Sequence, residues 1–378
     1  MNTRKGARVA SLCAAGVLAF GALAACGGGN DNNSASGGST GGSSNGGSSK
    51  ADVGVILPDA TTSPRWESQD RPNLQKAFDA AGLKSDIQNA QGDTAKFGQL
   101  CDSMIGEGVS VLMITNLDSD SGAACLQKAA NAGVQTIDYD RLTLGGGASY
   151  YVSFDNVKVG ELMGQGLVDA MKKDGKNSGN VVEVDGASTD NNAALFKQGY
   201  DSVLKANPQY KIVGDQSGNW DATKAGQVFD QMYTQSKGNI DGAIVANDTM
   251  SGGVIARLKA DGVAGKVPTT GQDASTEGLQ NILRGYQAGT VYKNTTLEAD
   301  AASKLAIDLI KNDKSAAAAL ATGTVKDTKL NKDVPSVLAT PVWITADTVK
   351  QVVADGQADA SQICTGDVAK FCTKYGVK

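Results

Sequence analysis

The sequence predicts an α/β protein built from doubly wound parallel sheets. Short β-rich runs alternate with amphipathic helical runs from residue 51 onward, at a spacing typical of parallel sheets that helices cover. Hydrophobic residues make up 40% of the chain and charged residues 20%, which is ordinary for a soluble globular protein. A length of 378 residues leaves room for one large domain or two medium ones.

The elements can be placed from their patterns. In the stretch 73–82, Leu74, Ala77, Phe78 and Ala81 share one helical face and Gly82 is a C-terminal cap candidate. Similar helical patterns cover 93–108 and 157–173. The predicted strands are 53–57, 85–89, 111–115, 135–139, 150–154, 180–184, 210–215, 241–246, 267–271, 289–293 and a late run at 335–344.

The N-terminal residues have the pattern of an export signal. A basic start is followed by the uncharged apolar stretch 9–25. The segment "LAAC" (23–26) resembles the lipobox of bacterial lipoproteins, which implies removal of 1–25 and a lipid on the Cys26 thiol. The alternative is a plain secretory signal with an incidental cysteine. Residues 26–50 are rich in Gly, Ser and Asn, and we expect a flexible linker there.

Four cysteines lie beyond that linker. An even number in an exported chain suggests disulfides, and four cysteines allow three pairings. We favour Cys101–Cys125, which would join neighbouring helices, and Cys364–Cys372, which would close a short C-terminal loop. A metal site is not expected, because the chain has no histidine and no CxxC pair.

The chemistry of the chain excludes several functions. Without histidine, neither a Ser-His-Asp triad nor a histidine metal site can form. No GxxxxGK[ST] phosphate loop occurs, and no GxGxxG follows a strand. We expect no cofactor. The net charge is −5 and no basic patch indicates a nucleic-acid partner.

Polar and aromatic residues gather just after the predicted strands, where α/β sheets bind ligands. The candidates are Arg65, Trp66, Asp140, Arg141, Asn192, Trp220, Asn247, Asp273 and Lys293. Carboxylates, amides and guanidinium groups satisfy sugar hydroxyls, which both donate and accept hydrogen bonds. Indole rings pack against the apolar C–H faces of a pyranose. The set therefore favours a sugar site.

The same segments carry a family resemblance. Together they resemble the periplasmic sugar-binding proteins of ABC importers, and most closely the D-xylose-binding branch. The resemblance covers about residues 51–345 and does not extend into the tail that follows. The ordered segments are "RW" (65–66), "YDR" (139–141), "SFDNVKVGEL" (153–162), "DNNAALFKQG" (190–199), "GDQ" (214–216) with Trp220, "NDTMSGG" (247–253), "GQDA" (271–274) and "TVYK" (290–293).

The resemblance implies a type I binding-protein fold, with two lobes joined by a three-stranded hinge and the sugar between them. The N-terminal lobe would comprise 51–154 and 294–338, and the C-terminal lobe 155–293 and 339–378. The crossings would lie near 153–156, Lys293 and 339–342. It further implies a monomer that binds a monosaccharide by closing its lobes and then docks on a membrane permease. In this family Asp140 would accept from a sugar hydroxyl, and Arg141 would donate to a hydroxyl or the ring oxygen.

Structural roles for these residues remain open. Asp140 and Arg141 could be an ion pair at a strand end, and Trp66 or Trp220 could be core residues. Asn192, and Asn247 or its neighbour Asp248, could simply cap helices. A strand-end lysine such as Lys293 is usually solvated. The polar loop "DATTSP" (59–64) lacks the charged residues often found there in the family, which leaves the choice of sugar open.

Two other functions remain in view. An exported glycosidase could use Asp140 and Asp273 as its carboxylate pair, although neighbouring Arg141 favours ionised acceptors over an acid. A sugar sensor would present its ligand to a membrane receptor instead of an importer. For the importer protein, as for these alternatives, the expected location is the outer face of the bacterial cytoplasmic membrane, where the lipid anchors the chain.

Overall fold

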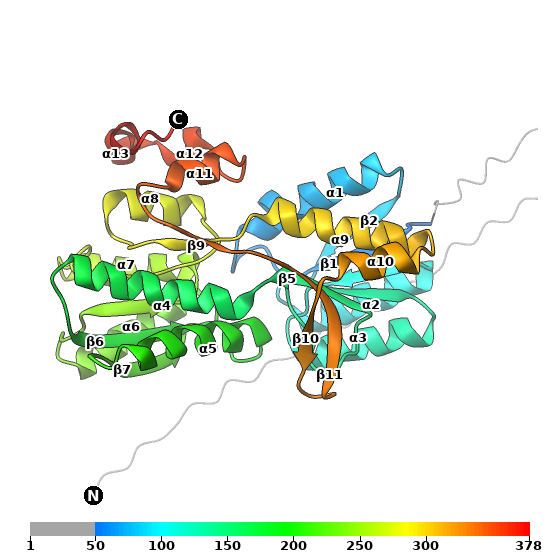
Figure 1. Cartoon of the computed structure of the whole chain (residues 1–378), viewed down its shortest axis with the longest axis horizontal. Helices are drawn as coiled ribbons and strands as arrows, with labels where there is room; N and C mark the ends of the chain where they lie inside the picture. Colours follow the sequence, from blue (N-terminus) through cyan, green and yellow to red (C-terminus); the bar gives the residue numbers. More distant parts are fainter. Residues whose placement is uncertain (1–49) are drawn as a thin grey trace, which may run out of the picture. The chain divides into compact units, whose positions relative to one another are not determined.

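The computed structural model describes residues 50–378 (Figure 1). The predicted signal peptide (1–25), the lipid attachment at Cys26 and all of the predicted linker except Lys50 lie outside the described residues. Within 50–378, no helix is both long enough and apolar enough to cross a membrane.

The N-terminal lobe is built on a seven-stranded sheet with the order β10-β11-β5-β4-β3-β1-β2. All neighbouring strands are parallel except the β10–β11 pair. Its strands are β1 (Val53–Leu57), β2 (Ser85–Asn89), β3 (Val111–Ile114), β4 (Gln135–Tyr139), β5 (Tyr150–Phe154), β10 (Gly323–Asp327) and β11 (Lys332–Ala339).

Helices cover both faces of this sheet (Figure 1). Val53, Val55 and Leu57 of β1 face one core together with α1 and α9, and Ile56 faces the opposite core with α2 and α3. This alternation follows from the period of two residues in a strand. The helical elements are η1 (Trp66–Asp70), α1 (Arg71–Ala80), α2 (Thr94–Glu107), α3 (Ser119–Asn131), α9 (Thr295–Ile310) and α10 (Lys314–Leu320).

The C-terminal lobe has a parallel three-stranded sheet in the order β7-β6-β8 and an antiparallel pair, β12-β9. Its strands are β6 (Gly179–Asp185), β7 (Tyr210–Ser217), β8 (Gly242–Val245), β9 (Thr290–Tyr292) and β12 (Val342–Ile344). Its main helices are α4 (Asn156–Lys173), α5 (Asn191–Ala206), α6 (Ala222–Gln235), α7 (Asp248–Ala260) and α8 (Thr276–Arg284).

The α/β fold class is confirmed, with three corrections to individual strands. The stretch 267–271 is not a regular strand, because it joins its neighbours only through single bridges such as Ala243–Thr269. The run 335–344 is two strands, β11 and β12, which lie in different sheets. Strand β10 was missed; it is the edge strand, largely exposed, and its sequence has no marked apolar alternation.

The chain passes between the lobes at three places. These are the step from β5 to α4 at Asp155, the step from β9 to α9 after Tyr292, and the step from β11 to β12 after Ala339. The resemblance places the crossings near 153–156, Lys293 and 339–342, and these positions stay a proposal. The exact lobe boundaries remain our proposal.

The C-terminal extension that follows β12 packs on α8 of the C-terminal lobe (Figure 1). Ile363, Val368 and Cys372 share a core there with Leu279 and Ile282. In the structure Cys364 is bonded to Cys372, and Cys101 of α2 is bonded to Cys125 of α3. The extension consists of α11 (Val349–Ala354), α12 (Ala360–Ile363), η2 (Gly366–Val368) and α13 (Ala369–Tyr375).

Helices α4 and α5 approach so closely that only glycine fits between them. A Cβ atom on Gly160 would lie 1.9 Å from the carbonyl oxygen of Phe196, and one on Gly199 would lie 2.2 Å from that of Val157. Since these contacts are with backbone, no side-chain rearrangement can relieve them. The close packing fixes the N-terminus of α5, which borders the site described below.

We predict that Gly160→Ala lowers the free energy of unfolding by about 1–3 kcal/mol, because the added methyl group overpacks the helix pair. Gly98→Ala in α2 is the control: nothing lies within 4 Å of its would-be Cβ. That variant should be neutral or more stable by up to about 1 kcal/mol. Urea unfolding followed by circular dichroism measures both, and equal stability of the two variants would contradict the prediction.

Candidate functional site: a cavity between the lobes

A small cavity lies between the two lobes, where the carboxyl ends of their strands meet. Its empty space is about 330 Å³, part of it open to solvent. All nine predicted ligand-binding residues line it, so the structure brings the whole predicted set together. The lining residues are Thr62, Ser63, Arg65, Trp66, Asp140, Arg141, Asp190, Asn192, Phe196, Trp220, Asn247, Gln272, Asp273 and Lys293.

Arg65 is buried and surrounded by three carboxylates. Its Nε and Nη2 atoms donate to the two oxygens of Asp70, each at 2.8 Å. Nη2 also donates to Glu298 at 2.5 Å, and Nη1 donates to Asp140 at 2.9 Å. Because most of its N–H groups are used inside the protein, Arg65 positions Asp140 and has little donor capacity left for a ligand.

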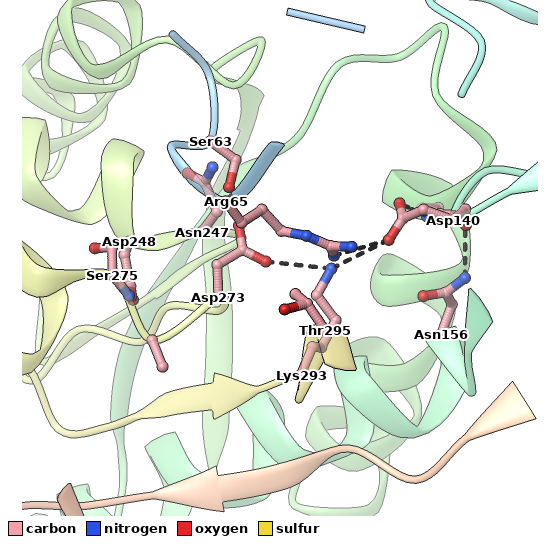
Figure 2. Close-up of polar contacts among 12 residues, drawn as sticks. Ser63, Arg65, Asp140, Asn156, Asn247, Asp248, Asp273, Ser275, Lys293 and Thr295 are labelled. Carbon is pink, nitrogen blue, oxygen red and sulfur yellow. Dashed lines mark hydrogen bonds and ion pairs between the residues drawn. The ribbon is translucent and has the colours of Figure 1, made fainter. Parts of the chain in front are cut away.

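Asp140 is approached by both Arg65 and Lys293 (Figure 2). Its Oδ2 accepts from Arg65 and lies 3.7 Å from Lys293 Nζ, and its Oδ1 accepts from Asn192 Nδ2 at 3.1 Å. Its backbone oxygen accepts from Tyr151, Ser153 and Asn192. These contacts join the end of β4 to the start of α5, so Asp140 connects the two lobes.

The charge of Asp140 is stabilised by its neighbours. Burial raises the pKa of Asp140, but the positive charges of Lys293, Arg65 and Arg141 outweigh burial and lower it to about 2. Burial also raises the pKa of Glu298, and the nearby charges of Asp140 and Asp70 add to that rise. Asp140 is therefore a carboxylate at neutral pH and acts as a hydrogen-bond acceptor.

Lys293 is buried between two carboxylates from different parts of the chain. Its Nζ lies 3.2 Å from Asp273 Oδ1 and 3.7 Å from Asp140 Oδ2, as Figure 2 shows. The other Asp273 oxygen accepts from Ser63 of the N-terminal lobe at 2.9 Å. Lys293 is 5% exposed, so the solvated strand-end role is wrong for it.

Arg141 does not pair with its neighbour in sequence. Its Nε lies 2.9 Å from Asp190 Oδ2 of the other lobe, and its Nη1 donates to the Asn116 carbonyl at 3.0 Å. Trp220 Nε1 donates to the same Asp190 oxygen at 3.2 Å. The possible local Asp140–Arg141 pair is therefore replaced by two longer-range pairs, each of which spans different segments.

The two asparagines have distinct local roles. Asn247 caps α7, because its Oδ1 accepts from Met250 N, and its Nδ2 reaches across the cleft to the Thr62 carbonyl at 3.1 Å. Asn192 is not a cap, since Asp190 takes that position at α5. This leaves the Asn192 side chain free to bond Asp140.

Both tryptophans of the cavity also serve the structure. The Trp66 ring lies 4.4 Å from the Arg65 guanidinium carbon and 5.7 Å from that of Arg141, within the range of cation–π contacts. Trp220 packs edge-on to Phe196 within the C-terminal core. Each of these tryptophans therefore packs in a core and also lines the cavity.

Three residues that line the cavity have an unusual backbone conformation. Asp140, Trp220 and Asp273 have φ angles of 64°, 60° and 90°, in the left-handed region that non-glycine residues rarely adopt. Such conformations cost on the order of 1–3 kcal/mol each and cluster at binding sites. The strain turns the chain sharply at these strand ends and aims the side chains into the cleft.

Several polar atoms around the cavity have no hydrogen-bond partner among residues 50–378. These include Trp66 Nε1, a donor, and Gln272 Oε1, an acceptor. Buried polar atoms in folded proteins rarely lack a hydrogen-bond partner, because each unpaired atom costs about 1–3 kcal/mol of stability. A small ligand that both donates and accepts hydrogen bonds fits these requirements.

Some residues of the site were missed by the sequence reading. Asp190 and Gln272 stand beside Asn192 and Asp273 in the segments that follow strands, and that position could have identified them. Asp70 and Glu298, which hold Arg65, gave no such signal, because they belong to helices that only folding brings to the site.

The fold and this interlobe cleft define a bilobal binding protein of the periplasmic type. The sequence profile described as "Periplasmic binding protein domain" matches residues 53–314. The chain therefore belongs to the periplasmic binding protein family, as the ordered segments indicated.

Two proteins of known name are similar in sequence over most of this chain, and a solved structure is similar in fold. It is 35% identical to the D-xylose-binding periplasmic protein of Haemophilus influenzae, over 82% of this chain and 91% of the relative. Identity to the D-xylose-binding periplasmic protein of Escherichia coli is 33%, over 84% and 93% respectively. The sugar-binding protein of Chloroflexus aurantiacus, solved with D-glucose, superposes with a TM-score of 0.74 at 27% identity, covering 82% of this chain and 98% of that one.

We predict a pH dependence of stability from Asp138, which precedes the site in β4. It holds the loop after the strand by accepting from Thr143 N and Oγ1 at 2.7 and 2.8 Å. Burial raises the pKa of Asp138 to about 7, against about 3.9 when unfolded. The folded state holds the extra proton between these values, so the free energy of unfolding falls as pH rises from about 4 to 7.

In Asp138→Asn this decline should be shallower. The loss of unfolding free energy between pH 4 and pH 8 should be smaller than in the parent, by on the order of a few kcal/mol. Some slope will remain, because burial also raises the pKa of Asp248 to about 7. The exposed Asp79→Asn is the control. Urea unfolding at several pH values measures the effect, and curves for Asp138→Asn that run parallel to those of the parent would refute it.

Proposed function

We propose that this protein is an extracytoplasmic substrate-binding lipoprotein of an ABC sugar importer, and that it binds a monosaccharide, D-xylose, in the cleft between its lobes. The observation that carries the proposal is the cavity itself. It is small and lined from both lobes by paired charges, amides and two indole rings.

The chemistry of the lining supports a sugar. Asp140 and Asp273 are acceptors, and Asn192, Arg141 and Lys293 are donors, so adjacent hydroxyl groups of one ring can each find a partner. Their own ion pairs hold these groups in place before a ligand arrives. A site held in this way rejects an epimer, because the wrong hydroxyl leaves a buried polar group unpaired.

Contacts across the cleft support a closure mechanism. Ser63 donates to Asp273, and Asn247 donates to the Thr62 carbonyl, so the loop after β1 touches the C-terminal lobe. A ligand that contacts both lobes favours the closed state, since only closure lets both sets of contacts form. Three narrow crossings allow the lobes to rotate as bodies.

Binding is favoured over catalysis. A glycosidase needs one carboxyl group that holds a proton near neutral pH. Asp140 is instead kept ionised by the cations around it, and Asp273 is paired with Lys293. The relatives are likewise named as binding proteins.

The choice of D-xylose rests on the names of the relatives at 33–35% identity. The permease partner follows from membership of the family, and the lipid anchor from the segment that ends at Cys26. A sensor that presents its sugar to a receptor would use the same cleft and differ only in its partner.

We predict one-to-one binding of D-xylose to residues 51–378 in calorimetric titration, tighter than binding of D-glucose, D-ribose or D-galactose. The sugar should be recovered unchanged by thin-layer analysis of the same samples. No heat with any of the four sugars would contradict the sugar assignment. If the protein hydrolysed an added xyloside, the glycosidase function would be favoured instead.

We further predict that Asp273→Asn weakens sugar binding by roughly 10- to 100-fold, because a hydrogen bond to a charged group contributes about 1.5–3 kcal/mol. The variant keeps an oxygen that can accept from Ser63, and Lys293 still has Asp140 as an ion-pair partner. The fold should therefore be retained. The control is Asp347→Asn, an exposed residue of the same lobe. Equal affinity of Asp273→Asn and the control would show that the site map is wrong.

A further inference from the structure

A polar bridge joins the C-terminal extension to the N-terminal lobe, outside the cavity. The Gln357 Oε1 atom accepts from Thr295 Oγ1 at 2.6 Å, and Gln357 Nε2 donates to Thr296 Oγ1 at 2.8 Å. Its backbone carbonyl accepts from Gln69 Nε2 at 2.8 Å. One residue of the extension therefore bonds two separate segments of the opposite lobe.

The bridge is held rigidly on its own side. Gly356 has a φ of 71° and turns the chain out of α11 directly before Gln357. Tyr292 of β9 donates to Asp355 at 3.2 Å, and Arg284 of α8 forms two bonds to Asp367 at 2.8 and 2.9 Å. The Cys364–Cys372 bond closes the end of the extension. Gln357 thus moves with the C-terminal lobe.

On the other side the bridge reaches elements that build the site. Gln69 lies in η1, the π-helical turn that also carries Trp66 of the cavity and Asp70, the partner of Arg65. Thr295 and Thr296 form the first turn of α9, which continues to Glu298, a second partner of Arg65. Single π-helical turns are uncommon and are frequently found at functional sites.

We propose that Gln357 is a positioning residue for ligand binding: it holds η1 and the start of α9 against the C-terminal lobe and thereby favours the closed state. This inference rests on the proposed binding function. The extension lies beyond residues 53–314, which the family profile matches. It changes affinity without touching the ligand.

The test is Gln357→Ala, measured in two ways. Two hydrogen bonds made in the closed state contribute on the order of 1 kcal/mol each, so affinity for D-xylose should fall roughly tenfold or more. The affinities for D-xylose and for a weaker sugar should fall by the same factor, because the pocket is unchanged. Small-angle scattering without sugar should show a larger radius of gyration, as the open state gains population.

The matched control is Gln351→Ala, an exposed glutamine in α11 of the same extension. Thr296→Val removes the acceptor for Gln357 Nε2 from the opposite side, and should act in the same direction even if Gln357→Ala loosens the extension. Unchanged affinity and unchanged scattering in Gln357→Ala would overturn the inference. If the parent binds none of the sugars, the proposed function fails, and the scattering of sugar-free protein still decides the role of Gln357.

Discussion

The arrangement of the site depends on one buried cation, Arg65. A guanidinium group removed from water is strongly destabilising unless its charge and its N–H groups are satisfied. Asp70, Glu298 and Asp140 supply that satisfaction from η1, from α9 and from the end of β4. Burial lowers the pKa of Arg65, but these carboxylates outweigh burial and raise it well above its usual value. Three segments far apart in the chain are thus held at one point.

Asp140 links Arg65 to the second lobe. Its carboxylate bonds Arg65 on one side and Asn192 on the other, and Lys293 lies between it and Asp273. Charges of both signs alternate through the cleft, so each charged group has a neighbour of opposite sign. Such a site offers fixed acceptors and donors to a neutral polyhydroxyl ligand, and the strained backbone at Asp140 and Asp273 is part of how they are aimed.

The cleft and the hinge have complementary roles. The lobes are joined by three crossings, and their facing surfaces carry polar groups that bond across the gap at Ser63 and Asn247. The C-terminal extension adds the Gln357 bridge near the second crossing. In our proposal the balance between open and closed states is set by these contacts together, and the sugar supplies the remainder.

The sequence alone determined the fold class, the family and nine of the residues that line the cavity. Strand–helix alternation is a local pattern, and residues that directly follow parallel strands must meet at one edge of a sheet. What each residue bonds was decided by tertiary structure. Asp140 and Arg141 are adjacent in sequence, yet each pairs with a distant partner, because opposite sides of the strand end face different segments. Glu298, Asp190 and Gln357 act through contacts between segments more than fifty residues apart or between lobes, and no local pattern encodes such contacts.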